Sequence, residues 1–99
     1  MLTGKQRAGL RRLANTIQPI IQIGKGGLND NIVSQVDGAL EDRELVKIAI
    51  LRTAQLDTRE ICDELARRTG AKPVQAIGKR FVLYRESVEN KRIDLDALP

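Results

Sequence analysis

The chain has 99 residues, of which 41% are hydrophobic and 30% charged, and this composition fits one small soluble domain with a modest core. It contains no histidine and one cysteine, which excludes a histidine-based catalytic or metal site, a thiolate cage and an internal disulfide. No segment approaches the roughly 20 apolar residues of a membrane span. We therefore expect a cytoplasmic protein without a membrane contact, which is not an enzyme and needs no cofactor or metal.

The net charge of +4 is unevenly distributed along the chain. Residues 1–29 contain five basic residues and no acid, and residues 65–85 contain six basic residues and again no acid. Residues 30–64 carry nine acids against four bases. This segregation predicts a basic surface and an acidic surface if the fold brings the two basic blocks together.

The first half of the chain predicts two helices around one short strand. The first helix covers Gly4 to about Thr16, with a solvent face made only of basic side chains. A strand at 19–23 follows, and then a second helix from about Asp30 to Leu40. Because acids are unfavourable at a helix C-terminus, we expect the acidic residues beyond Leu40 to lie in the connecting loop: Glu41, Asp42 and Glu44.

The second half predicts three strands and one helix. Alternating apolar residues indicate a strand at Leu45–Leu51, and a helix at Thr58–Thr69 ends at Gly70. The last two strands, Pro73–Ile77 and Phe81–Arg85, form a predicted hairpin.

These elements give the order α-β-α-β-α-β-β and predict an α/β domain over residues 1–86. The helices between the first three strands imply right-handed crossovers and mainly parallel pairing, and the hairpin adds an antiparallel strand. The simplest arrangement is a mixed four-stranded sheet packed by helices. Residues 87–99 form a C-terminal tail, of which Ile93, Leu95 and Leu98 could add a short apolar contact.

The tetrapeptide Gly24-Lys25-Gly26-Gly27 lies between the first strand and the second helix. Such a turn presents backbone N–H groups near a helix N-terminus, where an anion is favoured. The pattern lacks the residues of a Walker A loop and the third glycine of a dinucleotide fingerprint. Two interpretations are left: a G-x-x-G clamp on a nucleic-acid backbone, as in KH domains, or a tight bend with no ligand.

The scarcity of aromatic residues narrows the kind of nucleic acid. With Phe81 expected inward and only Tyr84 outward, the chain offers no platform on which bases stack. We therefore expect a monomeric protein that binds structured RNA through its backbone and shape, with a strong salt dependence. The candidate contacts are the glycine loop and the basic residues expected around it: Gly24, Lys25, Gly26, Gly27, Arg7, Arg11, Arg12, Lys79, Arg80 and Arg85.

Two other functions stay open at this point. The acidic block could bind a basic partner such as a ribosomal protein, which would make the chain a protein-interaction module. The glycine loop could instead hold a small ligand that carries a phosphate.

Several motifs together resemble the CRM domain family (chloroplast RNA splicing and ribosome maturation). They are the run Leu13-Ala14-Asn15, then Pro19 and the strand into Ile23-Gly24-Lys25-Gly26-Gly27-Leu28, and later Glu44-Leu45-Val46-Lys47, Gln75-Ala76-Ile77-Gly78-Lys79 and Val82-Leu83-Tyr84-Arg85. The match covers about residues 2–86, and a stand-alone domain of this length resembles the bacterial YhbY-type proteins.

This resemblance implies an RNA-binding protein that takes part in assembly of the large ribosomal subunit. It also implies a fold similar to the C-terminal domain of a bacterial translation initiation factor. It supports the glycine loop as the RNA contact. It also implies Lys47, Lys79 and Arg85 as candidates, of which Lys47 is new. Ala49 departs from the family, in which a basic residue is frequent at this position.

Overall fold

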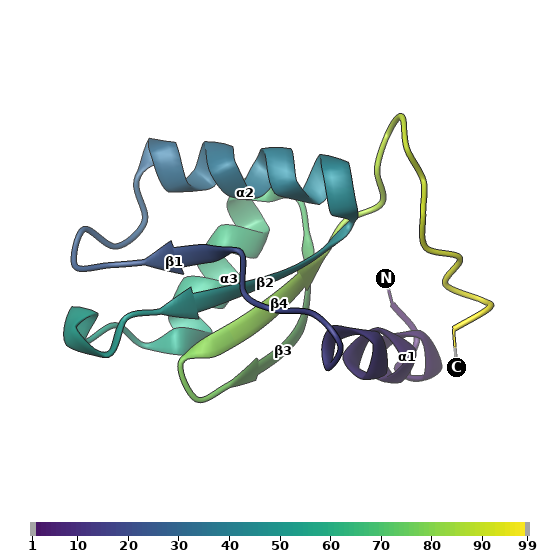
Figure 1. The fold of residues 1–99 in the computed structure, drawn as a ribbon, viewed down its shortest axis with the longest axis horizontal. Helices are drawn as coiled ribbons and strands as arrows, with labels where there is room; N and C mark the ends of the chain where they lie inside the picture. The colour runs from purple at the N-terminus through teal and green to yellow at the C-terminus, as the bar shows by residue number, and fades with distance from the viewer. Residues whose placement is uncertain (1, 99) are drawn as a thin grey trace.

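The computed structural model describes residues 2–98, which form one four-stranded sheet packed by helices (Figure 1). The helices are α1 (Gly4–Ala14), α2 (Asp30–Arg43), the short 3-10 helix η1 (Arg52–Ala54) and α3 (Thr58–Thr69). The strands are β1 (Ile21–Ile23), β2 (Leu45–Ile50), β3 (Lys72–Ile77) and β4 (Arg80–Tyr84). In the described range, no helix is both long enough and apolar enough to cross a membrane.

Each α-helix begins close to its predicted start because a capping side chain stands there. Thr3 and Gln6 cap α1 reciprocally, each side chain accepting a hydrogen bond from the other's backbone N–H at 3.0 Å. The side chains of Asn29 and Asp57 accept backbone N–H groups at the starts of α2 and α3. Gly70, in the left-handed region at φ +72°, follows the last residue of α3 as predicted.

The strand order is β1-β2-β4-β3, which corrects the expected pairing. β1 is parallel to β2, but β4 lies between β2 and β3 and runs antiparallel to both, so one pairing of three is parallel. The reason is the burial of β4, in which every residue from Phe81 to Tyr84 is buried. A strand that is apolar on both faces belongs in the centre of a sheet, whereas β3 contains Pro73 and suits an edge.

The two faces of the sheet have separate apolar clusters. α2 and α3 cover the face that carries Ile23, Ile48 and Phe81, and Cys62 is buried there. Burial raises the pKa of the Cys62 thiol to about 11, which keeps it protonated and unreactive.

α1 and the C-terminal tail cover the other face. Leu10 of α1 and the tail residues Leu95 and Leu98 pack in one cluster with Tyr84. Tyr84 points to this face, as strand alternation predicts, but it is buried there rather than exposed. α1 lies near one end of the molecule, away from the loop between β1 and α2 (Figure 1). The part of this face nearer that loop is consequently open.

The acidic residues after Leu40 differ from the prediction, because α2 continues to Arg43. Glu41 accepts hydrogen bonds from the Ser87 hydroxyl and from the N–H groups of Val88 and Glu89. These contacts compensate the charge that is unfavourable at the end of a helix.

Glu44 caps α2 with a fully buried side chain and a positive φ of 67°. Its carboxylate accepts the backbone N–H groups of Ser87 at 2.8 Å, Arg92 at 2.6 Å and Ile93 at 2.7 Å. Burial raises the pKa of this carboxyl, but the three N–H groups and Lys91 outweigh burial and leave the pKa below its ordinary value. The tail is thus held by an ionised carboxylate.

A group whose pKa is lowered by folding stabilises the fold above its unfolded pKa, about 4.3 for glutamate, and loses that contribution as the pH falls. We predict that Glu44→Gln lowers the free energy of unfolding at pH 7 by about 2 kcal/mol, because an amide cannot accept all three N–H groups. The variant should also lose less stability than the parent between pH 5 and pH 3. Urea unfolding across this range measures both effects. Glu89→Gln, which changes an exposed carboxylate, is the control, and an equal response of the two variants would contradict the role of Glu44.

Candidate nucleic-acid interface

The glycine loop is a closed turn whose N–H groups are partly used internally. The Gly27 N–H donates to the Gly24 carbonyl at 3.0 Å, and Gly27 has a positive φ of 62°. The expectation that Gly27 donates to a phosphate is therefore corrected. Among residues 2–98, no acceptor contacts the N–H groups of Lys25 and Gly26, and the Lys25 side chain is exposed. These two N–H groups are the donors that the loop offers to an anion.

Two other segments reach the same end of the sheet. A methyl group at Gly24 would lie 3.5 Å from Leu51 Cδ1, so the segment that contains η1 packs beside the loop. The Ile50 N–H donates to the Lys79 carbonyl at 2.7 Å, and Lys79 Nζ donates to the Leu56 carbonyl at 3.0 Å. The turn between β3 and β4 is thereby attached to this end, which adds Lys79 and the exposed Arg52 to Lys25.

Lys47 and Arg80 lie on the open part of the sheet face. Together with Gln75, Ile77 and Val82 they line a hollow of about 180 Å³. Arg80 pairs directly with Ala49 across β2 and β4. Ala49 has no charge, but Arg80 on the neighbouring strand places a positive charge beside it.

The basic residues of α1 do not converge on the glycine loop. α1 and the loop lie at opposite ends of the long axis of the molecule (Figure 1). Arg7 and Arg11 line a cleft beside β3 together with Arg59 from α3, and Arg12 is exposed on the same helix. The prediction that all basic residues surround the loop is therefore wrong for α1.

Arg85 is engaged inside the structure. Its guanidinium donates to the Asp37 carboxylate at 2.5 Å, to the Asp37 carbonyl at 3.0 Å and to the Thr69 carbonyl at 2.8 Å. These contacts connect the end of β4 to α2 and α3, so the structure gives Arg85 a structural task in place of the expected RNA contact.

We predict that Arg85→Lys destabilises the fold by about 1–3 kcal/mol, because an ammonium group cannot reproduce the fork that contacts both residues. RNA affinity at a temperature where the variant is folded should equal that of the parent. Urea unfolding and RNA titration measure the two quantities. A variant of unchanged stability with weakened RNA binding would return Arg85 to the interface.

Part of the acidic block is also used in contacts within the molecule. Asp37 binds Arg85, Glu41 and Glu44 hold the tail, and Glu64 accepts hydrogen bonds from Arg67 and Arg68. The two arginines lower the pKa of Glu64. The carboxylates of Asp30, Asp42, Glu60 and Asp63 stay exposed, so the block keeps an acidic surface that a basic partner could contact.

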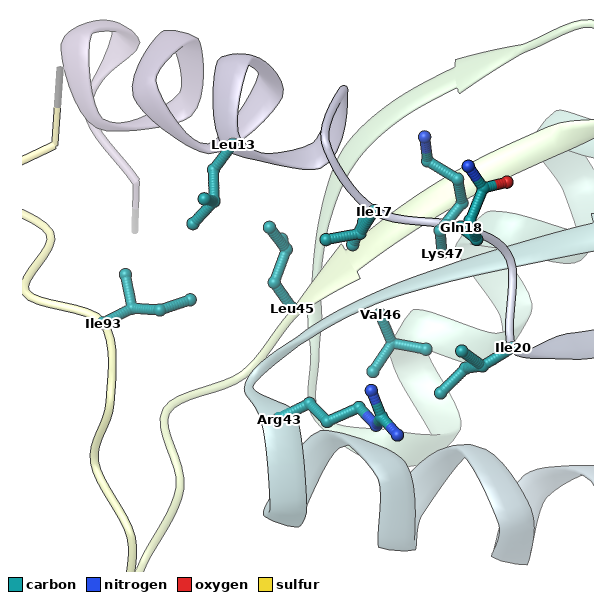
Figure 2. Close-up of a pocket in the computed structure, with 9 residues that line it drawn as sticks. All are labelled: Leu13, Ile17, Gln18, Ile20, Arg43, Leu45, Val46, Lys47 and Ile93. Atoms are coloured by element: carbon teal, nitrogen blue, oxygen red, sulfur yellow. The ribbon is translucent and has the colours of Figure 1, made fainter.

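A groove of about 450 Å³ between α1, β2 and the tail is mainly apolar. Figure 2 shows Leu13, Ile17 and Ile93 around Leu45, with Arg43 entering from the end of α2. Its lining suits aliphatic groups better than a chain of phosphates, although Lys47 belongs to both this groove and the basic hollow.

The comparisons with known proteins decide the family. The model of the CRS1/YhbY (CRM) domain matches residues 2–85. The chain belongs to this family. It is 46% identical over 95 residues to "Probable RNA-binding protein YqeI" of Bacillus subtilis, covering 96% of the chain and 99% of that protein. It is 33% identical over 90 residues to an RNA-binding protein of Haemophilus influenzae, covering 91% of each.

A solved structure supports the same fold. The solution structure of the hypothetical protein SAV1595 from Staphylococcus aureus has a TM-score of 0.80 with this CRM domain, at 49% identity over the whole of both chains. The family model and the solved structure therefore agree over residues 2–85, and the solved structure extends the agreement to the tail.

Sequence reasoning missed two basic residues that the CRM fold places beside the predicted ones. Arg52 lies on η1 near the glycine loop, and Arg59 lies in the first turn of α3 in the cleft with Arg7 and Arg11. Both belong to the block with a negative net charge, so charge counting along the chain hides them.

Proposed function

We propose that this protein is a non-enzymatic RNA-binding protein of the cytoplasm, which contacts structured ribosomal RNA during assembly of the large ribosomal subunit. The observation that carries RNA binding is the exposed end of the sheet, where Lys25 of the glycine loop lies at the same end as Arg52 and Lys79. The relatives named as RNA-binding proteins support the same assignment.

The contact would be made by a phosphate of the RNA backbone. The N–H groups of Lys25 and Gly26 donate to its oxygens, and the Lys25 ammonium supplies a mobile positive charge. Lys79 lies near this end with its ammonium group held by the Leu56 carbonyl, so it contributes a fixed charge. The open sheet face with Lys47 and Arg80 extends the positive field.

Neither aromatic ring takes part in this contact, because Phe81 and Tyr84 are both buried. Without stacking on rings, the protein recognises the shape and charge of the RNA rather than the sequence of a single strand. The ribosomal part of the proposal rests on the family resemblance alone.

We predict that Gly26→Asp weakens RNA binding about tenfold or more, because a carboxylate then occupies the side of the loop where the phosphate binds. The fold should tolerate the change, since Gly26 does not have a positive φ and a methyl group there meets nothing closer than 3.9 Å. Titration of a ribosomal RNA fragment at several salt concentrations measures the effect.

Two variants serve as controls for this substitution. Gly26→Asn has nearly the same size without the charge, and Gly38→Asp adds the same charge on α2, where a side chain meets no atom within 4 Å. Both should bind RNA within about twofold of the parent. Equal affinities of Gly26→Asp and Gly38→Asp would show that the loop is only a bend.

The ribosomal assignment has its own test. We expect the protein in a cell lysate to sediment with precursors of the large ribosomal subunit, and Gly26→Asp to move it to the soluble fraction. Detection in sucrose-gradient fractions, followed by crosslinking to RNA, measures this. Absence of the parent from all ribosomal precursors would remove the ribosome from the proposal and leave RNA binding intact.

A further inference from the structure

A cleft of about 340 Å³ follows the outer edge of β3, between α1 on one side and α3 on the other. Its floor is the strand segment 73–77, and Cys62 lies at its base. Arg7 and Arg11, one helical turn apart on α1, line one wall. Arg59 and Asp63, also one turn apart on α3, line the other wall.

The charges in this cleft are unbalanced. Three guanidinium groups face a space that contains one carboxylate, that of Asp63. Within residues 2–98, the side chains of Arg7, Arg11 and Arg59 form neither a hydrogen bond nor an ion pair. Cations gathered without partners repel one another, and an anion bound between them removes that cost. Guanidinium groups also match the oxygens of a phosphate in a two-pronged geometry.

The floor of the cleft disfavours an added protein strand. Pro73 lacks an N–H, and the pairing register shifts between Pro73 and Gln75. An extended peptide that joins an edge needs a regular row of N–H and carbonyl groups. A chain of phosphates needs only charges at suitable spacing, which the three arginines supply.

The cleft adjoins the open face of the sheet. Gln75 and Ile77 line both the cleft and the hollow that contains Lys47 and Arg80. Basic residues thus lie at three places, the glycine-loop end, the open face and the cleft beside β3.

We propose that this cleft is a second phosphate-binding site, which holds a stretch of RNA backbone separate from the one at the glycine loop. The inference rests on the proposed function and deepens it by naming the class of RNA. Two sites on different sides of the molecule select a folded RNA, such as a stem-loop, that presents two backbone segments. A short single strand can occupy only one of them.

The test compares two RNA probes by fluorescence anisotropy over a range of KCl concentrations. One probe is an oligouridylate of about 4 nucleotides, which is within the site size of a single small fold and too short to reach both sites. The other is a stem-loop of about 16 base pairs, long enough to present two successive grooves. The variant is Arg7→Gln/Arg11→Gln/Arg59→Gln. Its control, Lys5→Gln/Arg43→Gln/Arg92→Gln, removes the same charge at residues outside the cleft.

We expect the cleft variant to bind the stem-loop at least about tenfold more weakly than the control variant does. Its log–log salt slope should fall by about 2.7, since each of the three lost phosphate contacts on a duplex contributes about 0.9. Its affinity for the oligouridylate should match that of the control. Equal weakening of stem-loop binding by the cleft and control variants would overturn the second site.

If the glycine loop does not bind phosphate, the variants will show a different pattern of RNA affinities. Suppose that Gly26→Asp binds both probes with the parent's affinity while the cleft variant binds the stem-loop more weakly. The glycine loop is then not a phosphate site, and the cleft is. If a poly-glutamate peptide displaces the stem-loop from the cleft as well as an RNA of equal charge does, the cleft binds an acidic protein segment and the proposal is overturned.

A crosslinking measurement needs none of the arginine variants. Because Cys62 is buried, a thiol-reactive benzophenone will modify an introduced cysteine selectively. Ile77→Cys places the probe at a residue that is 67% exposed at the mouth of the cleft, and Val88→Cys places it at a residue that is 90% exposed on the tail. Stem-loop nucleotides should crosslink to the first position and not to the second; equal yields would overturn the proposal.

Discussion

The buried carboxylate of Glu44 fixes the path of the C-terminal tail, which local structure alone does not determine. The tail after β4 has no helix or strand, yet three of its backbone N–H groups meet this one side chain. The resulting path lays Leu95 and Leu98 over the same face as α1. Because α1 and the tail share this task, they occupy one end of the face, and the other end is free to carry Lys47 and Arg80.

Most of the fold follows from local signals in the sequence. Thr3, Asn29 and Asp57 identify the helix starts because each capping side chain accepts a backbone N–H only three residues further along the chain. The position of β4 in the sheet has no such local signal, since it depends on which strand is buried on both faces. The extension of α2 past Leu40 was equally hidden, because the hydroxyl and the two N–H groups that stabilise Glu41 come from a segment 46 to 48 residues away.

The candidate site was predictable in its types of residue rather than in its arrangement. The sequence assigns the glycine loop, Lys79 and Arg80 to turns and strand ends, because such positions have local sequence signals. The clamp formed by Arg85 and the cleft partner of α1, Arg59, depend on contacts between distant elements. One local signal does exist for Arg59: it stands one turn before Asp63 on a helix whose opposite face is apolar, so it must face outward.

The outer edge of β3 also bears on how the protein avoids binding to itself. A free strand edge is a template for the same edge of another molecule. Two copies that paired β3 with β3 about a two-fold axis would bring three arginines of each against their counterparts, and the repulsion opposes this contact. An RNA bound along the edge neutralises those charges while covering the strand. Charge repulsion thus opposes pairing of the empty edge, and the proposed RNA would cover the edge when bound.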